Sequence, residues 1–144
     1  MKIKLFSTLL FMAFLLSCKD EDTTGSYIGT WTASRIDVSD CENFSLNNSR
    51  PVQCTDNTCY QINFTDSAAY TFQIGLEFES GTWASDGVNL TFCREEEGEQ
   101  ICKTATGVIS ASGMRLSFVQ GNEGCITAYV MSKEEEAVEN PDGN

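Results

Sequence analysis

The chain has no histidine, only two prolines, and nine basic side chains against twenty-one acidic ones among its 144 residues. Without histidine there can be no Ser-His-Asp triad, no Cys-His pair and no His-Glu-x-x-His zinc site. The formal charge of −12 argues against nucleic acid as a partner, because phosphates need a basic surface. Gly-rich phosphate-binding loops are absent as well. These absences predict a protein that is not an enzyme and that holds no metal or cofactor.

One long hydrophobic run is present, at residues 5–16, and it is too short to span a bilayer. Together with the basic residues before it, the run has the layout of a signal peptide. It ends in Leu-Leu-Ser-Cys at residues 15–18, which resembles the lipobox of bacterial lipoproteins. The resemblance implies a signal peptide over residues 1–17 and a mature chain that begins at an acylated Cys18. The alternative is an ordinary signal peptide followed by an incidental cysteine.

A short charged segment, Lys-Asp-Glu-Asp at residues 19–22, follows the lipobox cysteine. It resembles the surface-export signal of Bacteroidetes lipoproteins. The resemblance implies a protein tethered by its lipid to the outer membrane and exposed on the cell surface, with an acidic linker over residues 18–26. We also expect the protein to be a monomer. A solvated charged linker is the alternative. Removal of residues 1–17 would take away two lysines and lower the formal charge from −12 to −14.

From residue 27 onward, apolar residues alternate with polar ones, as in Tyr60, Ile62 and Phe64. This period of two predicts half-buried antiparallel strands. We expect eight strands, near residues 28–38, 59–65, 69–75, 77–84, 87–93, 100–109, 113–119 and 125–132. Because tight turns join most consecutive strands, an all-β up-and-down barrel over residues 27–132 is favoured over a sandwich. The polar, acidic segment 133–144 is expected to be a disordered tail.

Two Gly-Thr-Trp motifs, at residues 29–31 and 81–83, resemble the signatures of lipocalins and of small lipocalin-like lipoproteins. The resemblance covers roughly residues 26–132 and implies an eight-stranded antiparallel barrel with a ligand-binding mouth. In lipocalins an arginine of a late strand packs over the signature tryptophan, here Trp31, and Arg115 is the candidate for that role. The chain departs from lipocalins in its shorter body and in having no helix before its tail.

The six cysteines after Cys18 are expected to gather at one end of the barrel, because the connections of an up-and-down barrel alternate between its two ends. They are Cys41, Cys54, Cys59, Cys93, Cys102 and Cys125. The hairpin position of Cys93 and Cys102 predicts a disulfide between them. Pairing of the first and last strands would bring Cys125 to Cys41, Cys54 or Cys59. A zinc site at Cys54-x4-Cys59 is the competing hypothesis.

The cysteine-bearing end also carries a long loop and many carboxylates, so it is the expected mouth. The carboxylates are Asp40, Glu42, Asp56, Glu95, Glu96, Glu97, Glu99 and Glu123. A negative rim repels anions and favours a neutral or cationic apolar ligand. The candidate ligand-binding residues are Trp31, Phe64, Tyr70, Phe72, Phe92 and Phe118, with Ile62, Leu90, Leu116 and Ala128 as further lining.

An eight-stranded barrel is only just wide enough for its own side chains or for one small ligand. The inward aromatic residues could therefore fill the barrel completely. The protein would then be a surface interaction module for a protein, as in protease inhibition, or for a glycan. Both interpretations of the barrel stay open at this point.

Asp66-Ser67-Ala68, in a predicted turn, resembles a short signal for O-glycosylation in exported Bacteroidetes proteins. The resemblance implies Ser67 as a glycosylation site. Residues 22–24 contain a second match to the same pattern.

Overall fold

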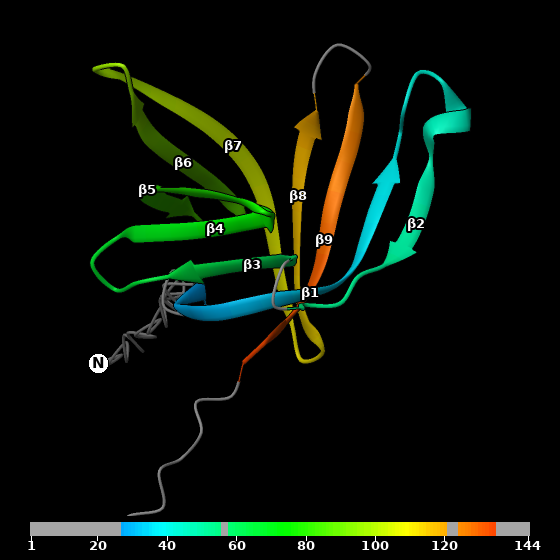
Figure 1. The fold of residues 1–144 in the computed structure, drawn as a ribbon, viewed down its shortest axis with the longest axis horizontal. Helices are drawn as coiled ribbons and strands as arrows, with labels where there is room; N and C mark the ends of the chain where they lie inside the picture. The colour runs from blue at the N-terminus through cyan, green and yellow to red at the C-terminus, as the bar shows by residue number, and fades with distance from the viewer. Residues whose placement is uncertain (1–26, 56–57, 121–123, 135–144) are drawn as a thin grey trace, which may run out of the picture.

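The alternating segments form strands in the structure, a computed structural model that describes residues 27–55, 58–120 and 124–134. All eight predicted strands are present, with a ninth, β2, that the sequence analysis did not predict (Figure 1). No helix among these residues is long and apolar enough to cross a membrane. The strands are β1 (Gly29–Ser39), β2 (Asn48–Pro51), β3 (Cys59–Phe64), β4 (Ala69–Gly75), β5 (Glu77–Asp86), β6 (Asn89–Glu96), β7 (Glu99–Ser110), β8 (Gly113–Gln120) and β9 (Cys125–Lys133).

The eight predicted strands form a closed antiparallel barrel, which confirms the expected fold. Strands β3 to β9 pair in sequence order, and β1 pairs with both β3 and β9. The pairing of β1 with β9 includes Trp31 opposite Lys133 and Ser39 opposite Ile126, so the first and last strands lie side by side along most of their length. Because the sheet closes, each of the eight barrel strands pairs with a neighbour on both sides.

The long first connection contains a 3-10 helix (Phe44–Leu46) and β2, where the sequence analysis placed only a loop. All four residues of β2 are exposed, so its sequence has no apolar alternation to indicate a strand. Backbone pairing with residues 35–38 of β1 holds it, and Ser49 donates a hydrogen bond of 2.7 Å to Asp37. Strand β2 is therefore held by its pairing with β1 and not by burial of its own side chains.

A sealed apolar core fills the end of the barrel where the described chain begins. Trp31, Phe64 and Trp83 are at most 5% exposed there, and the rings of Phe64 and Trp83 lie 4.8 Å apart in an edge-to-face arrangement. Tyr27 donates a hydrogen bond of 2.8 Å to the carbonyl of Gly107, which fixes the start of the chain at this closed end. The turns β3–β4, β5–β6 and β7–β8 also lie at this end.

The cation over the signature tryptophan is Lys133 rather than Arg115. Lys133 Nζ lies 5.6 Å from the ring centroid of Trp31, whereas Arg115 forms an ion pair of 2.7 Å with Asp37. Arg115 follows the inward-facing Met114 in β8 and so points out of the barrel. A Cβ at Gly29 would stand 2.6 Å from Lys133 Cε, so the glycine of the first motif makes room for this lysine. Lys133 is the last residue of β9, so this strand includes the first residue of the segment that was expected to be a tail.

The inward face of β9 is the opposite of the expected one. Tyr129 and Met131 belong to the core, while Ala128 pairs with Asp37 and Ser117, whose chain neighbours Ile36 and Leu116 point inward. Ala128 is therefore buried on the outer face and does not line the barrel. Both residue series of β9 alternate with a period of two, so the period alone could not distinguish the two faces.

Three disulfides lie toward the other, open end of the barrel, as expected. Cys93–Cys102 joins paired residues of β6 and β7, and Cys41–Cys125 joins the end of β1 to the start of β9. These bonds confirm the predicted hairpin bridge and the predicted partner class for Cys125. The remaining bridge, Cys54–Cys59, uses the two thiols of the competing zinc hypothesis, so that hypothesis is wrong in this structure.

At the open end the barrel wall divides into three parts, because β1 separates from β3, β5 from β6 and β7 from β8, and the strands spread apart (Figure 1). Strands β5 and β6 pair only from Thr82 opposite Cys93 toward the closed end. Strands β7 and β8 pair only from Thr106 opposite Ser117 toward the closed end. The β6–β7 hairpin between Arg94 and Ala105, called the β6–β7 arm below, therefore has no strand partner on either side among the described residues.

Candidate functional site

A cleft of about 490 Å³ lies at the open end, where β7 has separated from β8. Its floor comes from β4, its walls from β7, β8 and β9. We call it the ligand cleft, and it is lined by Phe72, Ile74, Lys103, Phe118, Val119, Gln120 and Tyr129. Its volume falls within the range of about 300–1,000 Å³ that is typical of small-molecule sites.

Aromatic rings give the ligand cleft its shape. The rings of Phe72 and Tyr129 meet edge to face at 5.5 Å, and those of Phe72 and Phe118 are stacked at 6.1 Å. Phe72 is almost completely buried beneath the cleft, while Phe118 is half-buried. These contacts fix the orientation of each ring, so the cleft has preformed apolar walls.

The structure separates the six predicted ligand-binding residues into three groups. Phe72 and Phe118 line the ligand cleft. Tyr70 and Phe92 border a smaller hollow of about 90 Å³ beside it. Trp31 and Phe64 lie in the sealed core of the closed end. The closed end of the barrel is thus filled with side chains, as one interpretation of the sequence expected, and the hollow space lies at the open end.

Two polar or charged residues of the mouth, Tyr129 and Lys103, were missed as site residues. Tyr129 is the chain neighbour of Ala128, which the sequence analysis placed inside the barrel, so that prediction left Tyr129 outside. Burial together with nearby Tyr60 raises the pKa of the Tyr129 phenol. Lys103 lies directly opposite the inward-facing Phe92 in the β6–β7 register, so its side chain enters the mouth. The predicted pairing of Cys93 with Cys102 could have identified Lys103. It places Phe92 opposite Lys103, and adjacent residue pairs of a hairpin face opposite sides of the sheet.

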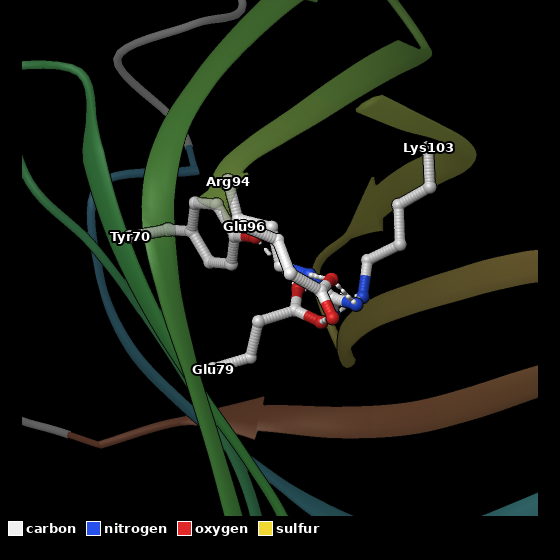
Figure 2. A network of polar contacts seen from close by, with 5 residues as sticks. All are labelled: Tyr70, Glu79, Arg94, Glu96 and Lys103. Carbon is white, nitrogen blue, oxygen red and sulfur yellow. Dashed lines mark hydrogen bonds and ion pairs between the residues drawn. The ribbon is translucent and has the colours of Figure 1, made fainter. Parts of the chain in front are cut away.

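Lys103 belongs to a network of charges above the apolar core, centred on the carboxylate of Glu79 (Figure 2). Arg94 Nη1 and Lys103 Nζ each lie 2.6 Å from a Glu79 oxygen, and the Tyr70 hydroxyl donates a hydrogen bond of 2.6 Å to Glu79. Arg94 also forms an ion pair of 2.8 Å with Glu96. The network links the β6–β7 arm to β4 and β5, which no backbone pairing does at this level.

The network keeps Glu79 ionised although its side chain is only 13% exposed. Burial raises the pKa of Glu79, but hydrogen bonds from Lys103, Tyr70 and Arg94 outweigh burial and hold the pKa below its usual value. The Tyr70 phenol has a raised pKa, because it is buried and donates a hydrogen bond to the Glu79 carboxylate. At neutral pH the centre of the network is therefore a carboxylate between two cations.

Lys103 also contributes to the ligand cleft through its position over the rings. Its Nζ lies 5.5 Å from the ring centroid of Phe118 and 5.9 Å from that of Phe72. An ammonium has three N–H donors, and Glu79 supplies the acceptors on one side. The cleft thus combines apolar walls with one fixed hydrogen-bond donor.

No protein-family model, no curated protein and no solved structure matches this chain. The lipocalin resemblance therefore depends on the two Gly-Thr-Trp motifs. The second motif has a local physical reason of its own. A Cβ at Gly81 would collide with the backbone carbonyl of Cys93, so β5 and β6 can approach there only without a side chain.

The remaining predicted sites lie away from the cleft. Ser67 is exposed in the β3–β4 turn at the closed end, and its glycosylation stays a prediction. The predicted lipidation site Cys18, with the signal peptide and linker, lies outside the described residues. Over residues 27–55, 58–120 and 124–134, no group of His, Cys, Asp and Glu side chains is placed to hold a metal ion.

Proposed function

We propose that this protein is a lipid-anchored, lipocalin-like surface lipoprotein, without enzymatic activity, that binds a small neutral apolar molecule in the ligand cleft. The observation that carries the proposal is the preformed hollow of about 490 Å³ between Phe72, Phe118 and Tyr129. Apolar walls with few polar groups are typical of sites that bury small molecules.

The charges around the cleft favour a neutral ligand over either kind of ion. The protein carries a formal charge of −12, and exposed carboxylates such as Glu95 and Glu97 stand at the mouth, so an anion is repelled as it approaches. The lining of the cleft holds Lys103 and no carboxylate, so a cation finds no counter-ion there. The sequence analysis expected a neutral or cationic ligand, and of these two we propose the neutral one. A carbonyl or hydroxyl oxygen on the ligand could accept a hydrogen bond from Lys103.

The lipid anchor at Cys18 would hold the mouth away from the membrane. Tyr27, the first described residue, is hydrogen-bonded at the closed end, so a tether that precedes it in the chain reaches the barrel from that side. A surface lipoprotein arranged in this way presents its ligand cleft to the surroundings of the cell.

A fluorescence titration with three naphthalene probes tests the proposal. N-phenyl-1-naphthylamine is neutral, 1-naphthylmethylamine is cationic and 1-naphthylacetate is anionic at pH 7.5. We expect saturable binding of the neutral probe, with weaker binding of both ions at low salt. Phe118→Ala should weaken binding, whereas Phe44→Ala, which changes a phenylalanine that is 81% exposed, should leave it unchanged. Absence of saturable binding, or equal effects of the two variants, would overturn the proposal.

A further inference from the structure

A second opening in the barrel wall lies between β5 and β6. Its hollow adjoins the ligand cleft at Phe72 and Ile74, which line both. The two strands stay paired up to Thr82 opposite Cys93 and then diverge, as Figure 1 shows on the side of the β6–β7 arm. A hollow of about 370 Å³ occupies the space between the diverging strands. Neither residues 77–81 of β5 nor residues 94–96 of β6 has a strand partner on the side of this opening.

The free edge of β5 presents unpaired backbone groups. Trp83 donates its backbone N–H to Ala68 at 2.8 Å, on the β4 side. Backbone groups of consecutive residues alternate between the two edges of an antiparallel strand, so Phe78 and Ser80 direct their N–H and C=O groups toward the opening. Unpaired groups of this kind are a template for another extended chain. Both residues are exposed, and Arg94 crosses the opening on the inward face to reach Glu79.

The side chains around the opening are apolar on the outer face and acidic within it. Phe78 and Leu76 are 77% and 73% exposed, although side chains of this size are seldom left uncovered together at one place. The walls of the opening hold four carboxylates, at Glu77, Glu79, Glu95 and Glu96, against one guanidinium, at Arg94. Among the described residues, Glu77 and Glu95 have no ion-pair partner.

We propose that this opening, the β5 edge site, binds an extended segment of a partner protein in which basic and apolar residues alternate. The segment would pair with Phe78 and Ser80 as a short additional strand. Its apolar side chains would lie beside Phe78 on the outer face, and its Lys or Arg side chains would point inward between Glu77 and Glu96. Alternation of side chains along the added strand produces this arrangement.

Other occupants fit the charges of the site less well. A second copy of this chain would bring the same carboxylates together across the new pair of strands. The last ten residues of the chain carry four carboxylates and no basic side chain, so they would be repelled from the site as well. Anionic lipid and nucleic acid are repelled for the same reason.

A labelled peptide of alternating valine and lysine, six residues long, tests the proposal by fluorescence anisotropy with the whole chain. We expect saturable binding that weakens as salt is added. The same peptide with N-methyl groups on its backbone, at the positions that would pair with β5, should bind at least tenfold more weakly, because it lacks those donors. A peptide of alternating valine and glutamate should not bind. Equal affinity for the lysine peptide and its N-methylated form would overturn the proposal.

Two variants at one position separate backbone pairing from side-chain contact. Ser80→Pro removes the N–H that faces the opening and leaves the β4–β5 ladder intact, so we expect at least tenfold weaker peptide binding. Ser80→Ala keeps the N–H and should bind within twofold of the unaltered chain. Neither variant should change binding of the neutral naphthalene probe, since Ser80 does not line the ligand cleft. Failure of this proposal is thereby distinguishable from failure of the proposed function.

Hydrogen exchange on the unaltered chain provides a readout that does not depend on the folding of a variant. The amides of Phe78 and Ser80 should exchange rapidly in the free protein and gain protection, tenfold or more, when the lysine peptide is added. Unchanged exchange at saturating peptide would overturn the proposal. Protection that rises with protein concentration in the absence of peptide would assign the edge to a second copy and also overturn it.

Discussion

Replacement of Glu79 by glutamine should loosen the connection between the β6–β7 arm and the rest of the barrel. The substitution keeps the size of the side chain and an acceptor for the Tyr70 hydroxyl, but it removes the charge that faces Arg94 and Lys103. No backbone pairing joins the arm to β5 at this level, so the side-chain network is the main contact that the substitution weakens.

The magnitude follows from the exposure of the three side chains. Glu79 is 13% exposed, whereas Arg94 and Lys103 are 41% and 38% exposed and can regain water when the carboxylate charge is lost. Breaking a fully buried ion pair costs about 3–5 kcal/mol, and breaking an exposed one costs about 0–1 kcal/mol. We therefore expect the free energy of unfolding to fall by about 1–2 kcal/mol, between these limits.

Urea unfolding at pH 7, followed by circular dichroism, measures this loss. With a denaturant slope of about 2 kcal/mol per molar, the midpoint should fall by roughly 0.5–1 M. Glu77→Gln is the matched control, because Glu77 lies on the same strand and the same face, is exposed, and has no ion pair among the described residues. That control should change stability by less than about 0.5 kcal/mol.

The pH dependence of the same difference tests its electrostatic origin. The folded protein lowers the pKa of Glu79, so the ionised carboxylate contributes stability above its unfolded pKa of about 4.3, and this contribution is lost as the pH falls through the lower folded value. The unaltered chain and Glu79→Gln should therefore converge in stability as the pH falls from about 4.3 through the lower folded pKa of Glu79. Equal losses for Glu79→Gln and Glu77→Gln, or a difference that persists in acid, would refute the reasoning.

Three further predictions concern the disulfides, the cation over Trp31 and an acidic residue on the outer face. Serine replacement of the Cys41–Cys125 pair, which closes a separation of 84 residues, should lower the free energy of unfolding by about 4–5 kcal/mol. Replacement of the Cys54–Cys59 pair, with a separation of 5, should lower it by about 2 kcal/mol. Urea unfolding that ranks the pairs in the opposite order contradicts the chain-entropy argument. Lys133→Gln should cost about 0.5–1 kcal/mol and shift tryptophan emission, whereas Arg115→Gln should leave the emission unchanged; an emission shift only in the second variant would restore the lipocalin arrangement. Hydrogen bonds from Ser49 and Arg115 lower the pKa of Asp37 to about 2, so stability should fall as the pH drops from about 4 to 2. In Asp37→Asn the Tm from thermal unfolding should depend less on pH over that interval.

The sequence predicted the barrel because its apolar residues repeat with a period of two over long stretches. Each strand in which one face carries the larger side chains, such as the segment from Tyr60 to Phe64, was assigned both a place and a face. Strand β2 could not be found in this way, because all four of its residues are exposed. The inward face of β9 was also missed, since both of its residue series are apolar enough to be buried.

The cysteines show how far topology alone can extend a prediction. The order of strands placed six thiols at one end of the barrel, and the hairpin identified Cys93–Cys102 without any side-chain geometry. The partner of Cys125 needed the ends of β1 and β9 in register, because three cysteines lie close together in the first connection. The structure selects Cys41, which leaves Cys54 and Cys59 to pair with each other.

The sequence by itself determined the local features of this protein: approximately where the eight barrel strands lie along the chain, which residues turn the chain, and how acidic its surface is. These depend on neighbours along the chain, and periodicity and composition record them directly. Only the tertiary structure decided where the barrel wall separates, because that depends on how far each pair of strands stays in register. The separation beyond Thr82 and Thr106 produced the ligand cleft, the free edge of β5 and the network around Glu79. Each of these features brings together residues of different strands, and the periodicity within one strand does not show which residues of another strand lie beside it.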